Sequence, residues 1–381
     1  MIPYGRQWID DADVAAVVSV LKSDFLTQGP QVPRFEASVA AYCGIEHAVA
    51  VNSATSALHI ACLALGVGPG DTVWTSPNTF VASANCARYC GAAVDFVDID
   101  PATLNLCPDA LAEKLEIAAR NGTLPKVVIP VHFAGTPCEM ERIHALSEQY
   151  GFAIVEDASH AIGARYRDTI VGDCRYSDIT VFSFHPVKII TTAEGGLATT
   201  RSAELARKMR LFRSHGVTRD IDDLEAKDEG AWYYEQTCLG YNYRMSELHA
   251  ALGVSQMAHL DAWVARRHKV RARYDAAFVD GPIEHLAPDV GTTSALHLYT
   301  VQVDRRRAVF ERMRSRGIGV NVHYIPVHTQ PDFRKLGFRT GQFPRSERYY
   351  DRAISLPIFG AISDDQVDIV IREIQAAVRA S

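Results

Sequence analysis

Between about residues 45 and 200, short apolar runs alternate with longer stretches in which apolar residues recur every three or four positions. The short runs are typical of strands buried on both faces of a sheet, and the longer stretches indicate helices. Strands that alternate with helices predict a mostly parallel sheet covered by helices, so the expected fold class is α/β. The expected strands are His47–Val51, Asp71–Thr75, Ala92–Val97, Lys126–His132, Phe152–Glu156, Ile179–Phe184 and Gly196–Thr199. The helices expected between them are Thr55–Leu65, Phe80–Tyr89, Asp109–Arg120 and Cys138–Tyr150.

The pattern differs on either side of this region. Before it, Asp11–Leu21 and Val32–Tyr42 predict two helices, and Gly44 is placed to end the second one. After it, a helical pattern runs from Ser246 to about Phe278. The elements expected next are a strand at Leu298–Val303, a helix at Arg306–Arg316, a strand at Val320–Ile325 and a helix at Asp364–Arg379.

This change of pattern predicts two domains, which suits a chain of 381 residues. Residues 1–255 are expected to form a large domain that includes the N-terminal helices. Residues 256–381 are expected to form a smaller C-terminal α+β domain, with the long helix as the connection.

Charge and cysteine content narrow the function classes. The net charge of −6 argues against a nucleic-acid partner or an anionic membrane surface. No apolar stretch approaches the roughly 20 residues of a membrane span, and the first residues lack the pattern of a signal peptide. The eight cysteines are scattered, without Cys-x-x-Cys, and no His-Glu-x-x-His is present. We therefore expect reduced thiols in a cytoplasmic protein, with neither a disulfide framework nor a metal site.

A candidate phosphate site lies at Asn52–Ser56, between a strand and a helix. Small residues there let backbone N–H groups approach an anion, and the helix N-terminus favours negative charge. The alternative is an ordinary helix cap, since Ser and Thr are common caps. Neither Gly-x-Gly-x-x-Gly after a strand nor Gly-x-x-x-x-Gly-Lys-Ser/Thr is present, which disfavours a Rossmann dehydrogenase and a P-loop enzyme.

Two further candidate residues have charged side chains and lie at or after the end of a predicted strand. Asp157 ends an apolar strand, where open α/β sheets bind ligands; the alternative is a turn-forming Asp. Lys188 follows another strand and is flanked by Val187, Ile189 and Ile190. Apolar neighbours desolvate an amine, lower its pKa and make it nucleophilic, although a loop lysine is more often a solvated charge. A phosphate cradle, a carboxylate for a ring nitrogen and a reactive lysine together are what pyridoxal 5'-phosphate (PLP) requires.

Six stretches, in this order, resemble the DegT/DnrJ/EryC1/StrS family of sugar aminotransferases, and the resemblance extends over essentially the whole chain. These stretches are Leu26–Pro30, Asn52–Leu58, Ser76–Phe80, Glu156–His160, Ser183–Gly196 and Gly240–Ser246. The resemblance implies a fold-type I PLP-dependent aminotransferase, in which a large domain with a mostly parallel sheet is joined to a smaller one.

A finer resemblance points to the branch of that family that acts in pseudaminic acid biosynthesis. It is carried by Phe184–Gly196, Phe212–Asp220 and Val322–His328. It implies that the amino group of L-glutamate is transferred to C4 of a UDP-linked 4-keto-6-deoxy-N-acetylhexosamine, UDP-2-acetamido-2,6-dideoxy-β-L-arabino-hex-4-ulose. Two alternatives stay open: an aminotransferase for another nucleotide-linked keto sugar, and a non-catalytic binding module. A sugar dehydratase of the same fold is disfavoured, because that branch has His at the position of Lys188.

The resemblance also implies roles for individual cofactor-binding residues. Lys188 would form the Schiff base, and Asp157 would keep the ring nitrogen protonated. The backbone of Ala54 and Thr55, together with Ser183, would hold the phosphate. Phe80 would stack on the ring, and His160 would lie near the ring hydroxyl; the alternatives are core packing for Phe80 and a structural role for His160.

Asn242 matches a residue that reaches the phosphate from the neighbouring subunit in this family, which implies a homodimer with shared active sites. From the residues alone, Asn242 is an ordinary turn residue. Arg213, His215 and Arg219 form either an anion-binding cluster or a solvated loop. The residues that match the sugar-nucleotide site are Tyr4, Asp24, Phe25, Leu26, Thr27, Val322, His323, Tyr324 and Ile325.

Overall fold

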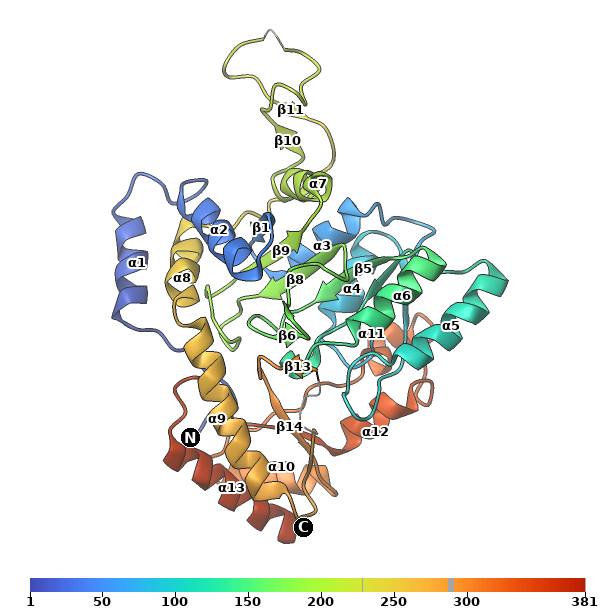
Figure 1. Cartoon of the computed structure of the whole chain (residues 1–381), viewed down its shortest axis with the longest axis vertical. Helices are drawn as coiled ribbons and strands as arrows, with labels where there is room; N and C mark the ends of the chain where they lie inside the picture. Colours follow the sequence, from blue (N-terminus) through green and yellow to red (C-terminus); the bar gives the residue numbers. More distant parts are fainter. Residues whose placement is uncertain (228, 287–290, 381) are drawn as a thin grey trace.

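The computed structural model describes residues 1–227, 229–286 and 291–380, and its centre is a seven-stranded sheet (Figure 1). The strand order is β1-β9-β8-β5-β4-β2-β3. Only β9 runs antiparallel to its neighbours β1 and β8, so the prediction of a mostly parallel sheet is confirmed. The strands are β1 (His47–Val51), β2 (Thr72–Thr75), β3 (Ala93–Phe96), β4 (Val127–Ile129), β5 (Ala153–Asp157), β8 (Ile179–Ser183) and β9 (Gly196–Thr200).

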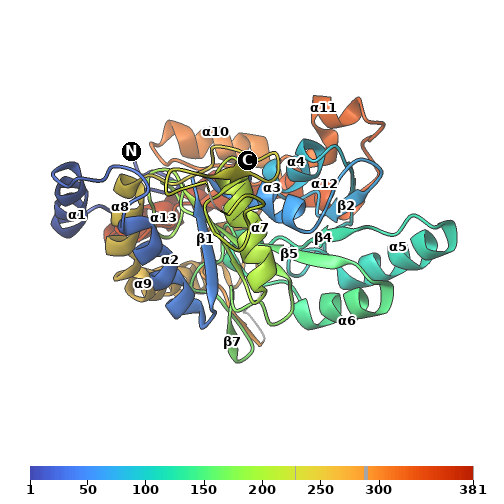
Figure 2. The ribbon, with the colours of Figure 1, turned by 90° about the horizontal axis from the view of Figure 1, so that it is seen from above.

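Successive side chains along each strand point to opposite faces of this sheet, and both faces are buried. In β1, Val49 and Val51 pack on the face covered by α3, α4 and α7, whereas Ala48 and Ala50 pack on the opposite face with α2. Figure 2 shows α5 and α6 on the side of β4 and β5 that faces away from α4. The helices are α2 (Gln31–Cys43), α3 (Ala54–Ala64), α4 (Ala82–Tyr89), α5 (Pro108–Asn121), α6 (Met140–Tyr150) and α7 (Ala203–Arg213).

The C-terminal part packs helices on a second, three-stranded sheet of order β12-β14-β15. The helical run expected from Ser246 to Phe278 is two helices in the structure, because the chain leaves the helix at Ala258 and His259. The division near residue 255 falls within α8 and stays a prediction. The elements are α8 (Glu247–Met257), α9 (Leu260–Phe278), β12 (Glu284–His285), β14 (Tyr299–Gln302), α10 (Arg306–Ser315), β15 (Ala353–Leu356) and α13 (Asp364–Arg379).

The strand predicted at Val320–Ile325 is wrong. This segment is an extended loop whose backbone meets β15 at an isolated bridge between Asn321 and Ser355, and Nδ1 of His323 lies 2.7 Å from the hydroxyl of Ser355. The N–H of Tyr324 donates to the side chain of Asn78 (3.4 Å) instead of to a neighbouring strand. Four consecutive residues of the segment, Asn321 to Tyr324, line a cavity, which a strand with alternating side chains would not allow.

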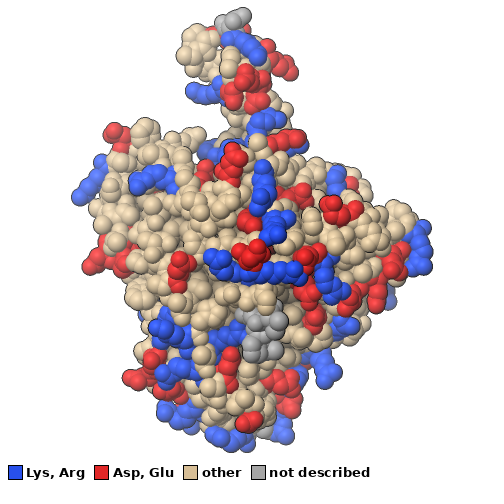
Figure 3. Space-filling model, viewed as in Figure 1, with Lys and Arg blue, Asp and Glu red and all other residues tan. Residues whose placement is uncertain are grey.

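The remaining elements are short or peripheral. Strands β10 and β11 form a hairpin that projects from the body beyond α7 (Figure 1). Acidic and basic side chains are interspersed on the face seen in Figure 3, and neither sign covers it. Among the described residues, none of the helices combines the length and apolarity that a membrane crossing requires. These elements are α1 (Asp11–Leu21), β6 (Arg165–Tyr166), β7 (Thr169–Ile170), β10 (Val217–Thr218), β11 (Glu235–Gln236), β13 (Thr292–Thr293), α11 (Pro331–Arg334) and α12 (Pro344–Arg352).

Candidate active site

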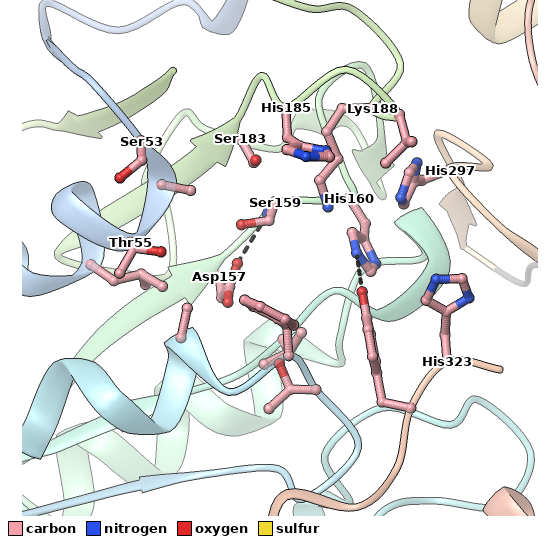
Figure 4. Close-up of a pocket in the computed structure, with 18 of the residues that line it drawn as sticks. Ser53, Thr55, Asp157, Ser159, His160, Ser183, His185, Lys188, His297 and His323 are labelled. Atoms are coloured by element: carbon pink, nitrogen blue, oxygen red, sulfur yellow. Dashed lines mark hydrogen bonds between the residues drawn. The ribbon is translucent and has the colours of Figure 1, made fainter. Parts of the chain in front are cut away.

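A cavity of about 460 Å³ opens where β5 and β8 end, beside the first turn of α3 (Figure 4). It brings together residues that the sequence analysis selected from widely separated motifs. The predicted residues that line it are Tyr4, Ala54, Thr55, Phe80, Asp157, His160, Ser183, Lys188, Val322, His323 and Tyr324.

The first turn of α3 forms one end of the cavity. Ser53 caps the helix by accepting a hydrogen bond from the N–H of Ser56 (3.1 Å), and the N–H groups of Ala54 and Thr55 have no intrahelical partner. Gly196 at the start of β9 lies against this turn, where a Cβ atom would come within 2.4 Å of the nitrogen of Ala54. Free N–H groups at a helix N-terminus favour an anion such as a phosphate.

Asp157 ends β5 and is buried in the floor of the cavity. Its backbone is held by hydrogen bonds to Pro130 and His132 on the adjoining segment. Its Oδ1 atom accepts a hydrogen bond from the N–H of Ser159 (3.1 Å; Figure 4). A fixed carboxylate at this strand end can hold a proton on a ring nitrogen.

Lys188 lies in the loop that follows β8. Its neighbours Ile189 and Ile190 are buried, as their apolar character predicted, and its own N–H donates to the carbonyl of His185 (2.8 Å). The residue is half-buried, and its side chain lines the cavity. Burial lowers the pKa of Lys188 to about 8, and the nearby charge of Asp157 opposes this shift.

Imidazole and phenol rings form the opposite end of the cavity. Burial and the charge of Lys188 lower the pKa of His160 and His297 well below the usual range, and that of His323 to about 3. Burial raises the pKa of Tyr324, whose hydroxyl lies 3.0 Å from Nε2 of His160 (Figure 4). These rings are therefore uncharged near neutral pH, so they do not compete with Lys188 for a proton.

Six predicted site residues do not line the cavity of this chain: Asp24, Phe25, Leu26, Thr27, Asn242 and Ile325. Asn242 is exposed, and its backbone pairs with Ser214. Arg213 forms an ion pair with Glu36 (2.7 Å), which occupies its guanidinium. His215 and Arg219 are exposed outside the cavity, so the hypothesis of an anion-binding cluster finds no support in this chain.

His297 is the main lining residue that the sequence analysis missed. Its ring lies 4.4 Å from that of His160, although the two residues are far apart in the sequence. Nothing around His297 in the sequence resembles a site motif, so only the tertiary fold reveals it. Ser53, Ser159 and His185 also line the cavity, and all three lie inside or beside motifs that the sequence analysis had already selected.

Residues 7–375 match the DegT/DnrJ/EryC1/StrS aminotransferase family. The chain is 40% identical over 390 residues to the spore coat polysaccharide biosynthesis protein SpsC of Bacillus subtilis, with 100% of this chain and 98% of SpsC covered. Its fold is similar to that of Helicobacter pylori PseC, an aminotransferase involved in pseudaminic acid biosynthesis (TM-score 0.92, 30% identity, 100% of both chains). It is also similar to the PLP form of the putative sugar aminotransferase Spr1654 of Streptococcus pneumoniae (TM-score 0.90, 29% identity, 100% and 99% covered).

The residues in the cavity fit PLP, the cofactor of that family. The free N–H groups of α3 suit its phosphate, Asp157 suits its ring nitrogen, and the desolvated amine of Lys188 suits its aldehyde. The Nδ1 atom of His160 is buried and has no hydrogen-bond partner among the residues that the structure describes, so a polar group of a ligand can satisfy it. The chain is thus a PLP-dependent aminotransferase, and it belongs to the DegT/DnrJ/EryC1/StrS family.

Proposed function

We propose that this enzyme transfers the amino group of L-glutamate to C4 of a UDP-linked 4-keto-6-deoxy-N-acetylhexosamine, in the cytoplasm, as a step of pseudaminic acid biosynthesis. The observation that carries the proposal is a single cavity that joins the desolvated Lys188 to a wall of uncharged polar rings. Uncharged rings that can form hydrogen bonds suit the hydroxyl and amide groups of a sugar, which are themselves uncharged. The whole-chain similarity to PseC supports the choice of sugar.

Each residue has a defined task in this proposal. When bound, PLP supplies an electron sink for the carbon that loses a proton. Asp157 keeps the ring nitrogen protonated, and α3 anchors the phosphate. Lys188 moves a proton to and from the reacting carbon, and its pKa of about 8 leaves part of the amine unprotonated near neutral pH. The neutral His297 and His323 hold and orient the acceptor without taking that proton.

A second candidate is amination of a different nucleotide-linked keto sugar. The observation in its favour is the similarity to SpsC, which is higher in sequence identity than the similarity to PseC. SpsC is described as acting in spore coat polysaccharide biosynthesis. The cofactor-binding residues are the same in both candidates, so only the acceptor distinguishes them.

The test is to incubate the holoenzyme with L-glutamate and a panel of nucleotide-linked keto sugars, and to identify each aminated product by mass spectrometry and NMR. We expect the highest kcat/KM with the UDP-linked 4-keto-6-deoxy-N-acetylhexosamine of L-arabino configuration. A higher value with another sugar would establish the second candidate. The protein without glutamate and the Lys188→Ala variant are the controls.

We also propose a homodimer in which each cavity is completed by the partner. The predicted segment Asp24–Thr27 is exposed and lies against the start of α8, where the N–H of Glu247 donates to the carbonyl of Leu26 (3.1 Å). Asn242 is exposed just before this helix. Phe25 and Leu26 expose 53% and 51% of their surface, so the same region offers apolar area to a second copy.

Subunit mixing tests the shared site. Inactive Lys188→Ala protein mixed with impaired Asn242→Ala protein should regain activity, because one site of each heterodimer then carries neither change. Simple counting gives about half of the wild-type activity per heterodimer. Heterodimers confirmed by differential tags that stay inactive would show that Asn242 serves its own chain or none.

A further inference from the structure

Ser83 connects α4 to the carboxylate of Asp157. It lies in the first turn of α4, is fully buried, and places its hydroxyl 2.6 Å from Oδ2 of Asp157, which is 74 positions away in the sequence. The hydroxyl of Thr79 lies 2.7 Å from that of Ser83. No sequence motif drew attention to Ser83, although it follows the Ser76–Phe80 stretch directly.

The chemistry of the three groups fixes the direction of the hydrogen bonds. An ionised carboxylate only accepts, so the single hydroxyl proton of Ser83 points to Asp157. The carbonyl of Phe80, at 3.3 Å, competes poorly for the same proton. Thr79 must then donate to Ser83, and the order is Thr79 to Ser83 to Asp157. The 2.6 Å separation is in the range of charge-assisted O–H···O bonds.

We propose that Ser83 is a positioning residue: it holds the Asp157 carboxylate oriented toward the ring nitrogen of PLP, with Thr79 fixing the direction of the Ser83 hydroxyl. Together with the N–H of Ser159 on Oδ1, Ser83 gives each carboxylate oxygen one donor from a different element. The same first turn of α4 follows Phe80, so one segment presents the ring-stacking candidate and orients the carboxylate. This inference rests on the proposed function, since it concerns the electron sink of transamination.

Loss of the Ser83 hydroxyl has a definite physical consequence. Without this donor the Asp157 carboxylate is held less firmly, so its hydrogen bond to the protonated ring nitrogen weakens and the ring nitrogen loses its proton more readily. The ring then carries less positive charge and is a weaker electron sink. A less positive ring repels the proton on the linkage between Lys188 and PLP less strongly. The pH at which half of the bound PLP has lost this proton, seen as a change in its visible absorption band, therefore moves upward.

The test compares Ser83→Ala with Ser83→Thr, which keeps the hydroxyl, and with Ser147→Ala. Ser147 is a buried serine of α6 that donates only to its own helix. We expect Ser83→Ala to retain PLP and to show an upward shift of the spectral midpoint, with both half-reactions about ten-fold slower, as loss of a hydrogen bond to a charged group implies. Ser83→Thr and Ser147→Ala should both have the midpoint of the wild type. An unchanged midpoint in Ser83→Ala overturns the proposal.

Thr79→Val supplies a second test that keeps the shape of the side chain. Without its donor, the Ser83 hydroxyl can rotate toward Phe80, so we expect a smaller shift of the midpoint in the same direction. If the pH midpoint of Thr79→Val equals that of the wild type, the proposed order of the hydrogen bonds is wrong. This result can be obtained even when Ser83→Ala does not fold. The midpoint is measured without any substrate. A wild-type enzyme that fails to react with glutamate would therefore contradict the proposed donor and leave this test valid.

Discussion

The two ends of the cavity differ in charge and in origin. At the cofactor end, Ser53–Thr55, Asp157 and Lys188 come from one sheet and the turns directly after its strands. At the ring end, His297 and Tyr324 come from loops of the C-terminal part. The cofactor end contains a carboxylate and an amine, whereas burial keeps the rings at the other end neutral. Under the proposed function, the residues at the sheet edge carry out the chemistry and the loops of the C-terminal part bind the acceptor.

Removal of the Lys188 amine is expected to have the largest effect of all changes at the cofactor end. We expect Lys188→Ala to lower kcat by at least about 10³-fold, in line with loss of a proton-transferring group, and to leave the fold intact. Borohydride reduction of the wild type followed by peptide mapping should place the cofactor on Lys188. The control is Lys335→Ala, which removes an exposed lysine with a side chain that is 77% accessible. A covalent label on any other lysine would contradict the assignment.

Asp157→Asn should have the next largest effect. The amide cannot keep the ring nitrogen protonated, so we expect kcat to fall about 10²-fold, as for loss of a key electrostatic group, with most of the PLP retained. PLP content and both half-reactions can be followed by absorbance. Asp168→Asn, a change at an exposed carboxylate, is the matched control. Near-normal turnover would show that Asp157 only terminates its strand.

The cofactor end was predictable because its residues lie in local patterns. Asp157 and Ser183 end apolar strands, and the small residues at Asn52–Ser56 stand between a strand and a helix. Parallel strands bring such positions to one edge, so sequence order was enough to group them. Gly44 illustrates the same locality, since it ends α2 in the left-handed conformation (φ 67°), as predicted.

The ring end was only partly predictable, since it depends on tertiary packing. Val320–Ile325 has the pattern of a strand, but in the structure its polar rings line the cavity and its backbone pairs with β15 at an isolated bridge from Asn321. His297 is held in place through its backbone carbonyl, which accepts a hydrogen bond (3.3 Å) from the buried Arg267 of α9. Neither feature has a signature within a few residues of sequence.

The pH dependence of cofactor capture tests the desolvation of Lys188. Only the neutral amine attacks an aldehyde, so the rate at which apoprotein takes up PLP should fall about ten-fold per pH unit below 8 and level off above it. An exposed lysine, with a pKa of about 10.4, would give a rate that keeps rising to pH 10. Stopped-flow absorbance distinguishes the two profiles, and a continued rise above pH 9 would show that the amine is solvated.

The smallest expected effect comes from a hydrogen bond within the ring end, between Tyr324 and Nε2 of His160 (3.0 Å). Tyr324→Phe keeps the ring but leaves His160 without this partner. A hydrogen bond of this kind contributes about 0.5–1.5 kcal/mol, so we expect both half-reactions to slow by about 2- to 10-fold. Tyr176→Phe, within the separate cluster of α5 and α6, should change neither rate.

Because His160 is the predicted partner of the ring hydroxyl, the visible band of bound PLP should shift in Tyr324→Phe. A change confined to the sugar half-reaction would mean that the ring end recognises the acceptor without influencing the cofactor.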